Sequence, residues 1–80
     1  MAVLTGANLS GARFEGSNLV GAQITGTDLT TANFRRANLA ESDLSRTNLT
    51  RVKLLRADFS GANLSGADLA KRRLVGMDFS

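Results

Sequence analysis

A bulky apolar residue occupies every fifth position of this 80-residue chain, without a single interruption. The sixteen positions are Leu4, Leu9, Phe14, Leu19, Ile24, Leu29, Phe34, Leu39, Leu44, Leu49, Leu54, Phe59, Leu64, Leu69, Leu74 and Phe79. A helix turns by ~100° per residue and would scatter these side chains around its surface, whereas a flat strand would send them to alternate faces. A period of five therefore excludes both elements as the repeating unit and requires the chain to turn in every pentad.

The other pentad positions carry residue types that suit such turns. The residue two places before the bulky one is Ala, Ser or Thr in thirteen of sixteen pentads, and the residue directly before it is Asn or Asp in eleven. All eight glycines lie two places after the bulky residue. Glycine tolerates φ > 0, and Asn or Asp side chains bond to nearby backbone groups, so both types favour a tight turn at a fixed offset.

We expect each pentad to make a quarter turn, so that four pentads close a square coil of about 20 residues with the bulky side chains inside. Sixteen pentads then form four coils, stacked at the ~4.8 Å strand spacing and hydrogen-bonded to one another through the backbone. The predicted fold class is all-β, as a single solenoid domain over residues 1–80. Neither end of the sequence shows an amphipathic capping helix. We therefore expect either end-to-end docking, with Leu74, Met77 and Phe79 as candidates, or a chain that is excised, designed or part of a larger assembly.

Composition disfavours an enzyme. The chain has no Cys and no His, which removes disulfides, thiolate sites, and the commonest metal ligand and general base. No apolar run approaches the ~20 residues that a membrane span needs, and the first residues lack the pattern of a secretion signal. We therefore expect a cytoplasmic protein with no cofactor, no metal and no small-molecule substrate.

The pattern Ala-(Asn/Asp)-Leu-x-Gly, clearest over residues 61–69, resembles the pentapeptide-repeat family along the whole chain. This resemblance implies a right-handed quadrilateral β-helix. Members of the family are functionally diverse, and the best understood mimic DNA and protect or inhibit type II topoisomerases, which confers quinolone resistance. The resemblance therefore implies gyrase binding as one possible role.

Charge is predicted to be uneven around the coil, because residues 20 apart should lie above one another. The faces built on Leu4 and Leu9 are neutral, and the face built on Leu19 is acidic through Glu41, Asp58 and Asp78. The fourth face is rich in arginine, with Glu15 as its one acidic residue. We interpret it as a candidate interaction face, made of Arg13, Arg35, Arg36, Lys53, Arg56, Arg72 and Arg73 with the outward apolar pair Leu55 and Val75. The alternative is a solvated face that maintains solubility or pairs with the acidic face of a neighbour.

These features predict a scaffold or protein-interaction module that binds another protein, or itself, through its ends or its arginine-rich face. Topoisomerase binding by DNA mimicry is the alternative, although a net charge of +3 does not suit a mimic of DNA. Weak, non-specific anion or nucleic-acid binding is a second alternative. Nucleic acid is disfavoured because all four Phe lie at inward positions, which leaves no aromatic side chain for base stacking.

Overall fold

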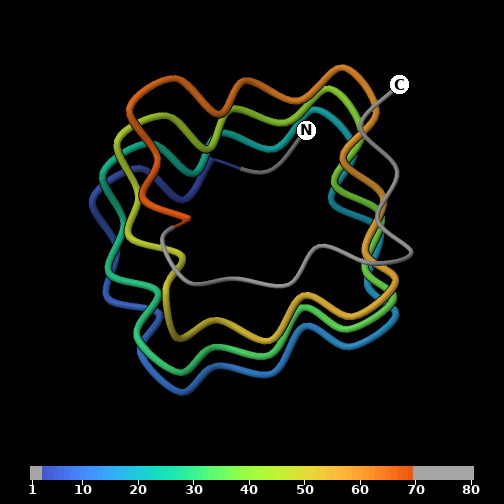
Figure 1. Ribbon diagram of the computed structural model, residues 1–80, viewed down its shortest axis with the longest axis horizontal. Helices are drawn as coiled ribbons and strands as arrows, with labels where there is room; N and C mark the ends of the chain where they lie inside the picture. The colour runs from blue at the N-terminus through green and yellow to red at the C-terminus, as the bar shows by residue number, and fades with distance from the viewer. Residues whose placement is uncertain (1–2, 70–80) are drawn as a thin grey trace.

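The chain winds as a stack of square coils in the computed structural model, which describes residues 3–69 (Figure 1). Each side of a coil carries one β-bridge residue, the residue directly before the bulky one, and is followed by a turn. Parallel bridges join residues 20 apart, as in Val3 with Gln23, Gln23 with Asp43, and Asp43 with Asn63. Within residues 3–69 there is no helix and no strand longer than a single bridge residue. The predicted 20-residue register is confirmed over this range.

Backbone hydrogen bonds hold neighbouring coils together in a regular ladder. The N–H of most bulky residues up to Leu49 donates to a carbonyl 19 residues later, as from Leu4 to Gln23 at 2.7 Å, although Leu29 does not. The N–H of the residue before it donates to a carbonyl 21 residues earlier, as from Asp28 to Ala7 at 3.2 Å. The stack therefore satisfies backbone groups that a solitary coil would leave unpaired.

Each corner of the coil is a four-residue turn that the repeat explains locally. The N–H of the small residue donates to the carbonyl of the preceding bulky residue, as from Ala7 to Leu4 at 3.0 Å. At every described corner except that of Arg51 the third turn residue has φ > 0, as at Gly6 with φ 75, which is the geometry of a type II turn. The residue before the bulky one supplies a side-chain oxygen to the same turn, since Oδ1 of Asn8 accepts the N–H of Ser10 at 3.0 Å.

Five corners adopt this left-handed conformation without glycine. They are Thr31, Arg36, Glu41, Arg46 and Arg56, with φ between 58 and 60. An L-residue in this region costs about 1–2 kcal/mol, so the surrounding structure has to impose it. The ladder does so, because the N–H of Arg36 donates to the carbonyl of Leu55 at 2.9 Å and that of Glu41 to Ser60 at 2.7 Å.

The core is the interior of the coil, filled by the bulky residues and the small residues beside them. The most buried positions, including Ile24, Phe34 and Leu44, have exposed fractions of 0–1%. The bulky residues nearest the two ends of the described range are only partly buried; they are Leu4, Leu9, Phe14, Leu64 and Leu69. The predicted inward direction of the bulky side chains is thus confirmed for the middle of the stack.

Three buried inward positions are polar and are satisfied within their own turn. The hydroxyls of Thr27, Ser42 and Thr47 donate to the carbonyls of Ile24, Leu39 and Leu44, at 2.8, 2.6 and 2.6 Å. Each hydroxyl therefore enters the core with a hydrogen-bond partner, which removes most of the cost of burying it.

Several predicted residues lie outside the described range: Arg72, Arg73, Leu74, Val75, Met77, Asp78 and Phe79. The prediction of a single domain over 1–80 likewise extends beyond it. Among residues 3–69, no helix is long and apolar enough to cross a membrane.

Candidate interaction surface

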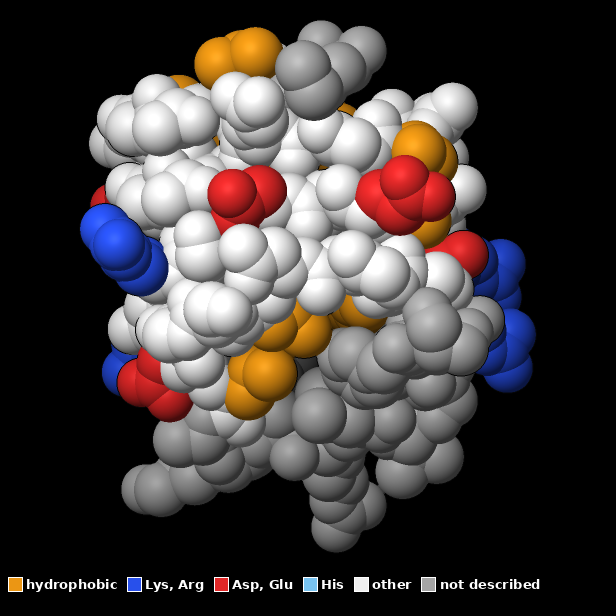
Figure 2. Space-filling model, turned by 90° about the horizontal axis from the view of Figure 1, so that it is seen from above, with side chains coloured by type: hydrophobic (Ala, Val, Ile, Leu, Met, Phe, Trp, Pro, Cys, Tyr) orange, Lys and Arg blue, Asp and Glu red, His pale blue; other side chains and the backbone are white. Residues whose placement is uncertain are grey.

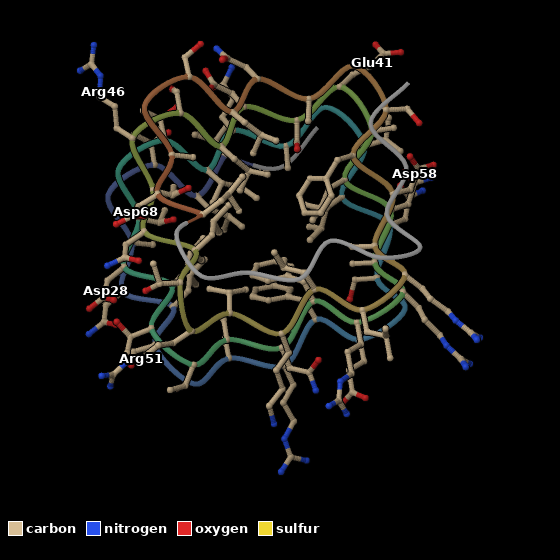
Figure 3. The ribbon with its side chains drawn as sticks, in the orientation of Figure 1. Asp28, Glu41, Arg46, Arg51, Asp58 and Asp68 are labelled. Atoms are coloured by element: carbon tan, nitrogen blue, oxygen red, sulfur yellow. The ribbon has the colours of Figure 1, made fainter. Side chains whose placement is uncertain are left out.

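Basic side chains gather on one side of the coil, the lower side in Figure 3. The corners labelled Arg46 and Arg51 show that residues 42–46 form the upper side and residues 52–56 the lower one. The bridges of Arg13 to Asn33 and of Asn33 to Lys53 place residues 12–16 and 32–36 on the same side. The structure therefore brings together the described basic residues that the sequence predicts for this face, and all of them are exposed; they are Arg13, Arg35, Arg36, Lys53 and Arg56.

Arg51 also borders this side, although its pentad is that of the neighbouring face. Figure 3 shows it at the corner where the side bearing Asp28 and Asp68 meets the lower side. A corner side chain belongs equally to the two sides that it joins, and a division of the sequence by pentads cannot express this. The basic surface is hereafter defined as Arg13, Arg35, Arg36, Arg51, Lys53 and Arg56, with Glu15 as the one acidic residue of the described part of that side.

The basic side chains stand on a fixed backbone. Phe14 and Phe34, beneath Arg13 and Arg35, stack with ring centroids 5.0 Å apart and planes 8° from parallel. The N–H of Gly16 donates to the carbonyl of Arg35 at 3.0 Å, and the N–H of Arg35 to Oδ1 of Asn33 at 3.1 Å. The six basic side chains form no ion pair with another residue of the described range. They are therefore held apart by the backbone and remain open to a partner.

A shallow depression of about 470 Å³ lies on the basic surface, lined by Glu15, Gly16, Arg35, Arg36 and Leu55. Gly16 stands in the same column as Arg36, one coil away, and a Cβ at Gly16 would meet nothing within 4 Å. Leu55 points outward and is 57% exposed, so it adds apolar surface among the basic side chains. The depression thus combines open space, two guanidinium groups and an apolar surface.

Carboxylates on the other sides serve their own turns. Oδ1 of Asp28 accepts the hydroxyl of Thr30 at 2.7 Å and its N–H at 3.1 Å, and these bonds lower the pKa of Asp28. The corresponding bonds from Ser45 lower the pKa of Asp43, with a smaller contribution from the charge of Arg46. Asp58 accepts the hydroxyl and N–H of Ser60 in the same way, at 2.5 and 2.9 Å. These acidic groups have a structural role in the turns.

The side opposite the basic surface is mostly uncharged. Figure 2 shows that side, where most of the described surface is white, that is, backbone and uncharged polar side chains, with a few acidic side chains and with basic side chains at its edges. A second depression, of about 340 Å³, lies on the side that bears Asp28 and Asp68 and is lined by the polar residues Thr30, Asn48, Thr50 and Arg51. Residues 3–69 contain no group of three or more His, Cys, Asp or Glu side chains that could hold a metal ion.

Solved structures with this coil geometry include proteins of several biological settings. QnrB1, a plasmid-mediated fluoroquinolone resistance protein, superimposes with a TM-score of 0.88 at 20% identity, covering 98% of this chain and 37% of that one. Rfr23 from the cyanobacterium Cyanothece 51142 gives 0.65 at 30% identity, covering 99% and 48%. HetL from the cyanobacterium Nostoc sp. strain PCC 7120, involved in heterocyst differentiation regulation, gives 0.52 at 34%, covering 94% and 37%. This chain therefore spans less than half the length of each of these three proteins.

Among curated proteins, no match to the chain was found. The family model for pentapeptide repeats matches eight copies, over residues 2–36 and 32–70. This match covers most of the sequence and agrees with the 20-residue bridge register and the inward bulky positions. The chain belongs to the pentapeptide-repeat family and has its right-handed quadrilateral β-helix fold.

Proposed function

We propose that this protein is a non-enzymatic scaffold that binds an acidic protein surface through its basic surface. The observation that supports this most is the six exposed basic side chains on and beside one side of a backbone held by ladder bonds, where Glu15 is the one acidic residue of the described part of that side. The proposal includes one solenoid domain over residues 1–80, with sixteen pentads in four coils, and a cytoplasmic location.

The repulsion between neighbouring arginines on the basic surface supports a binding role for these charges. Arg36 and Arg56 occupy left-handed corners where glycine would be unstrained, and they lie in one column of successive coils. Two like charges ~5 Å apart in water repel by somewhat under 1 kcal/mol, and the nearby basic groups add to this. Left-handed non-glycine corners also occur on other sides, so the backbone strain by itself does not single out this surface. An acidic partner would offset the repulsion, which a purely structural role would leave uncompensated.

A protein partner suits this surface better than nucleic acid. Phe34 and Phe59 are 1% and 2% exposed, and one face of the partly buried Phe14 stacks on Phe34, so these rings belong to the interior of the coil and do not stand among the basic side chains. Leu55 adds apolar area among the arginines, which protein surfaces can match. The non-enzymatic part of the proposal is supported separately. QnrB1 and HetL are named for resistance and for regulation of differentiation, and neither name states a catalysed reaction.

The test uses a fluorescein-labelled peptide of twelve glutamates and measures its anisotropy with the protein at low salt. We expect saturable binding that weakens steeply when the ionic strength rises from 0.1 M to 1 M, because the Debye length falls from ~10 Å to ~3 Å. Arg56→Glu should weaken binding, whereas Arg46→Glu, with the same charge change at an equally exposed left-handed corner, should have little effect. Equal losses from both variants would mean that net charge alone drives binding and would refute the proposal.

Self-association belongs to the same proposal, through the basic surface or through the ends of the stack. Light scattering on the wild-type protein and on Arg36→Glu with Arg56→Glu separates the two. Loss of the oligomer in the variant and in high salt would support the basic surface, because both treatments weaken charge attraction. An oligomer that survives both would assign the interface to the ends, where Leu74, Met77 and Phe79 are the first residues to substitute.

Topoisomerase binding is a second candidate, favoured by the TM-score of 0.88 to QnrB1. At 20% identity this likeness concerns the fold, and an exposed basic surface does not resemble the phosphate backbone of DNA. A supercoiling assay with gyrase and a fluoroquinolone tests it. Restoration of supercoiling by this protein would support the candidate, and no effect at protein concentrations well above that of gyrase would exclude it.

A further inference from the structure

We infer that the acidic segment bound by the basic surface carries an apolar side chain between its carboxylates, and that this side chain packs on Leu55 in the depression beside Arg35 and Arg36. The inference rests on the proposed function and specifies the chemistry of the partner. It requires a ligand in which negative charge surrounds an apolar group.

Leu55 is surrounded by basic groups in two directions. Within its own coil Lys53 lies two residues before it and Arg56 directly after it. Along the stack, Arg35 lies one coil away in the same column, and the N–H of Arg36 donates to the carbonyl of Leu55 at 2.9 Å. A partner that places an apolar side chain on Leu55 therefore brings its flanking carboxylates within reach of several cations at once.

The depression has room for such a side chain. Gly16 has no side chain to cover Arg36. A Cβ at Gly16 would meet no other heavy atom within 4 Å, so the space beside it is open. The lining is mixed, with Leu55 as its apolar part and Glu15 opposing a ligand that is negative throughout. A uniformly charged polyanion gains nothing from Leu55 and is repelled by Glu15, whereas an apolar side chain gains from being withdrawn from water.

The position of Leu55 in the pentad is one that Val20 also occupies, on a different side. Val20 is 43% exposed and follows the bulky residue Leu19, as Leu55 follows Leu54. Its side of the coil carries the bridge column of Asn18, Asn38 and Asp58. Exposure of an apolar residue at this pentad position is therefore not sufficient for the proposed site, and Val20 provides a matched control.

The experiment compares two labelled peptides, each with four glutamates flanking a central residue, which is leucine in one and serine in the other. Anisotropy at low salt should show the leucine peptide binding about tenfold more tightly, the size of effect expected from withdrawing a leucine side chain from water. Leu55→Ser should abolish this preference, so that the two peptides bind with similar affinity. Val20→Ser should leave the preference intact.

Arginine variants test the surrounding charges. Arg36→Gly should weaken both peptides several-fold, since it removes one cation from the depression while restoring the residue type favoured at that corner. Arg46→Gly relieves the same backbone conformation outside the basic surface and should alter neither affinity. Circular dichroism and thermal melting confirm in each case that the fold is retained.

The outcomes separate this inference from the proposed function. Equal binding of the two peptides, unaffected by Leu55→Ser, would overturn the inference and leave the acidic-partner proposal standing. Failure of both peptides to bind would overturn both. An equal loss from Leu55→Ser and Val20→Ser would show a non-specific apolar effect and overturn the inference. A single-stranded oligouridylate of equal charge that bound more tightly than the leucine peptide would overturn both in favour of nucleic acid.

Discussion

Arg36 and Arg46 have the same left-handed backbone conformation, with φ 59 at each, on corners two pentads apart and therefore diagonally opposite in the coil. Both are exposed, and the N–H of each donates to a carbonyl of the next coil at 2.9 Å. Only Arg36 belongs to the basic surface. Substitutions at both residues change the same strained backbone conformation, but only those at Arg36 change the charge of the basic surface.

Replacing either arginine by glycine should stabilise the fold. Relief of the left-handed conformation should stabilise the folded state by about 1–2 kcal/mol. The greater entropy of glycine in the unfolded state offsets about 0.5–1 kcal/mol of this. Arg46→Gly and Arg36→Gly are thus each expected to raise the free energy of unfolding by roughly 0.5–1 kcal/mol. Urea denaturation followed by circular dichroism measures this. A lower midpoint for both variants would contradict the assigned corner geometry.

Thr31 should give a larger effect than either arginine. A β-branched residue at φ 58 is a true conformational outlier, since two heavy atoms on Cβ crowd the backbone. Thr31→Gly is expected to stabilise the protein by about 1 kcal/mol or more. The reverse change, Gly21→Ala at φ 71, should destabilise by about 1 kcal/mol through strain alone, because its Cβ would meet nothing within 4 Å. Thermal melts of both variants provide the comparison, and shifts of the same sign would refute it.

The middle of the core should be more sensitive than its end. Leu49 is 1% exposed, whereas Leu9, two coils away in the same column, is only partly buried. Leu49→Ala should cost about 2–5 kcal/mol, and Leu9→Ala about half of that or less. Urea midpoints test the ratio. Equal losses would indicate that Leu9 is covered in solution, for example by a second copy docked on that end.

Stability should fall in acid partly through Asp28. Its pKa is lowered in the folded state by the hydroxyl and N–H of Thr30, so its contribution is present above the unfolded-state pKa of about 4 and is lost as pH falls through the lower folded-state value. Thr30→Val should raise the pKa of Asp28 and reduce the pH dependence of unfolding below about pH 4. NMR titration of the carboxyl group and urea midpoints between pH 2 and 7 measure both effects.

Thr50→Val is the control for this titration. The hydroxyl of Thr50 donates to Oδ1 of Asn48 at 2.7 Å, in the same column and geometry as the bond from Thr30 to Asp28. Asn48 does not titrate, so this variant should change stability equally at all pH values. A pH-dependent loss in Thr50→Val similar to that in Thr30→Val would exclude Asp28 as the titrating group.

Buried hydroxyls should be replaceable by apolar groups of similar shape. Thr47 is 2% exposed and donates to the carbonyl of Leu44, which also accepts the N–H of Thr47 at 3.3 Å. Val52 occupies the next equivalent position with 0% exposure. Thr47→Val should therefore change the free energy of unfolding by less than about 1 kcal/mol, because the carbonyl keeps one donor. A loss well above this would show that the hydroxyl has a further partner.

Much of the architecture follows from the repeat itself. The regular spacing of bulky residues such as Ile24 and Leu44 predicts their inward direction, and the 20-residue register follows from four quarter turns. The recurrence of Asn and Asp before the bulky residue predicts the turn bonds, as seen from Ser10 to Asn8. These features depend on contacts within one pentad or between equivalent positions of successive coils. They can therefore be predicted from a periodic sequence.

Only part of the candidate surface can be predicted from the repeat. The repeat predicts that Arg13, Arg35, Arg36, Lys53 and Arg56 lie on one side, because a constant register converts position in the chain into position on the coil. Only the three-dimensional arrangement shows that Arg51 borders this side, that Gly16 opens a depression beside Leu55, and that five corners without glycine keep φ > 0 whereas the Arg51 corner does not. The physical reason is that these properties arise between coils. A corner joins two sides, a depression needs neighbours of unequal size in adjacent coils, and a strained φ persists only where hydrogen bonds from the next coil hold it.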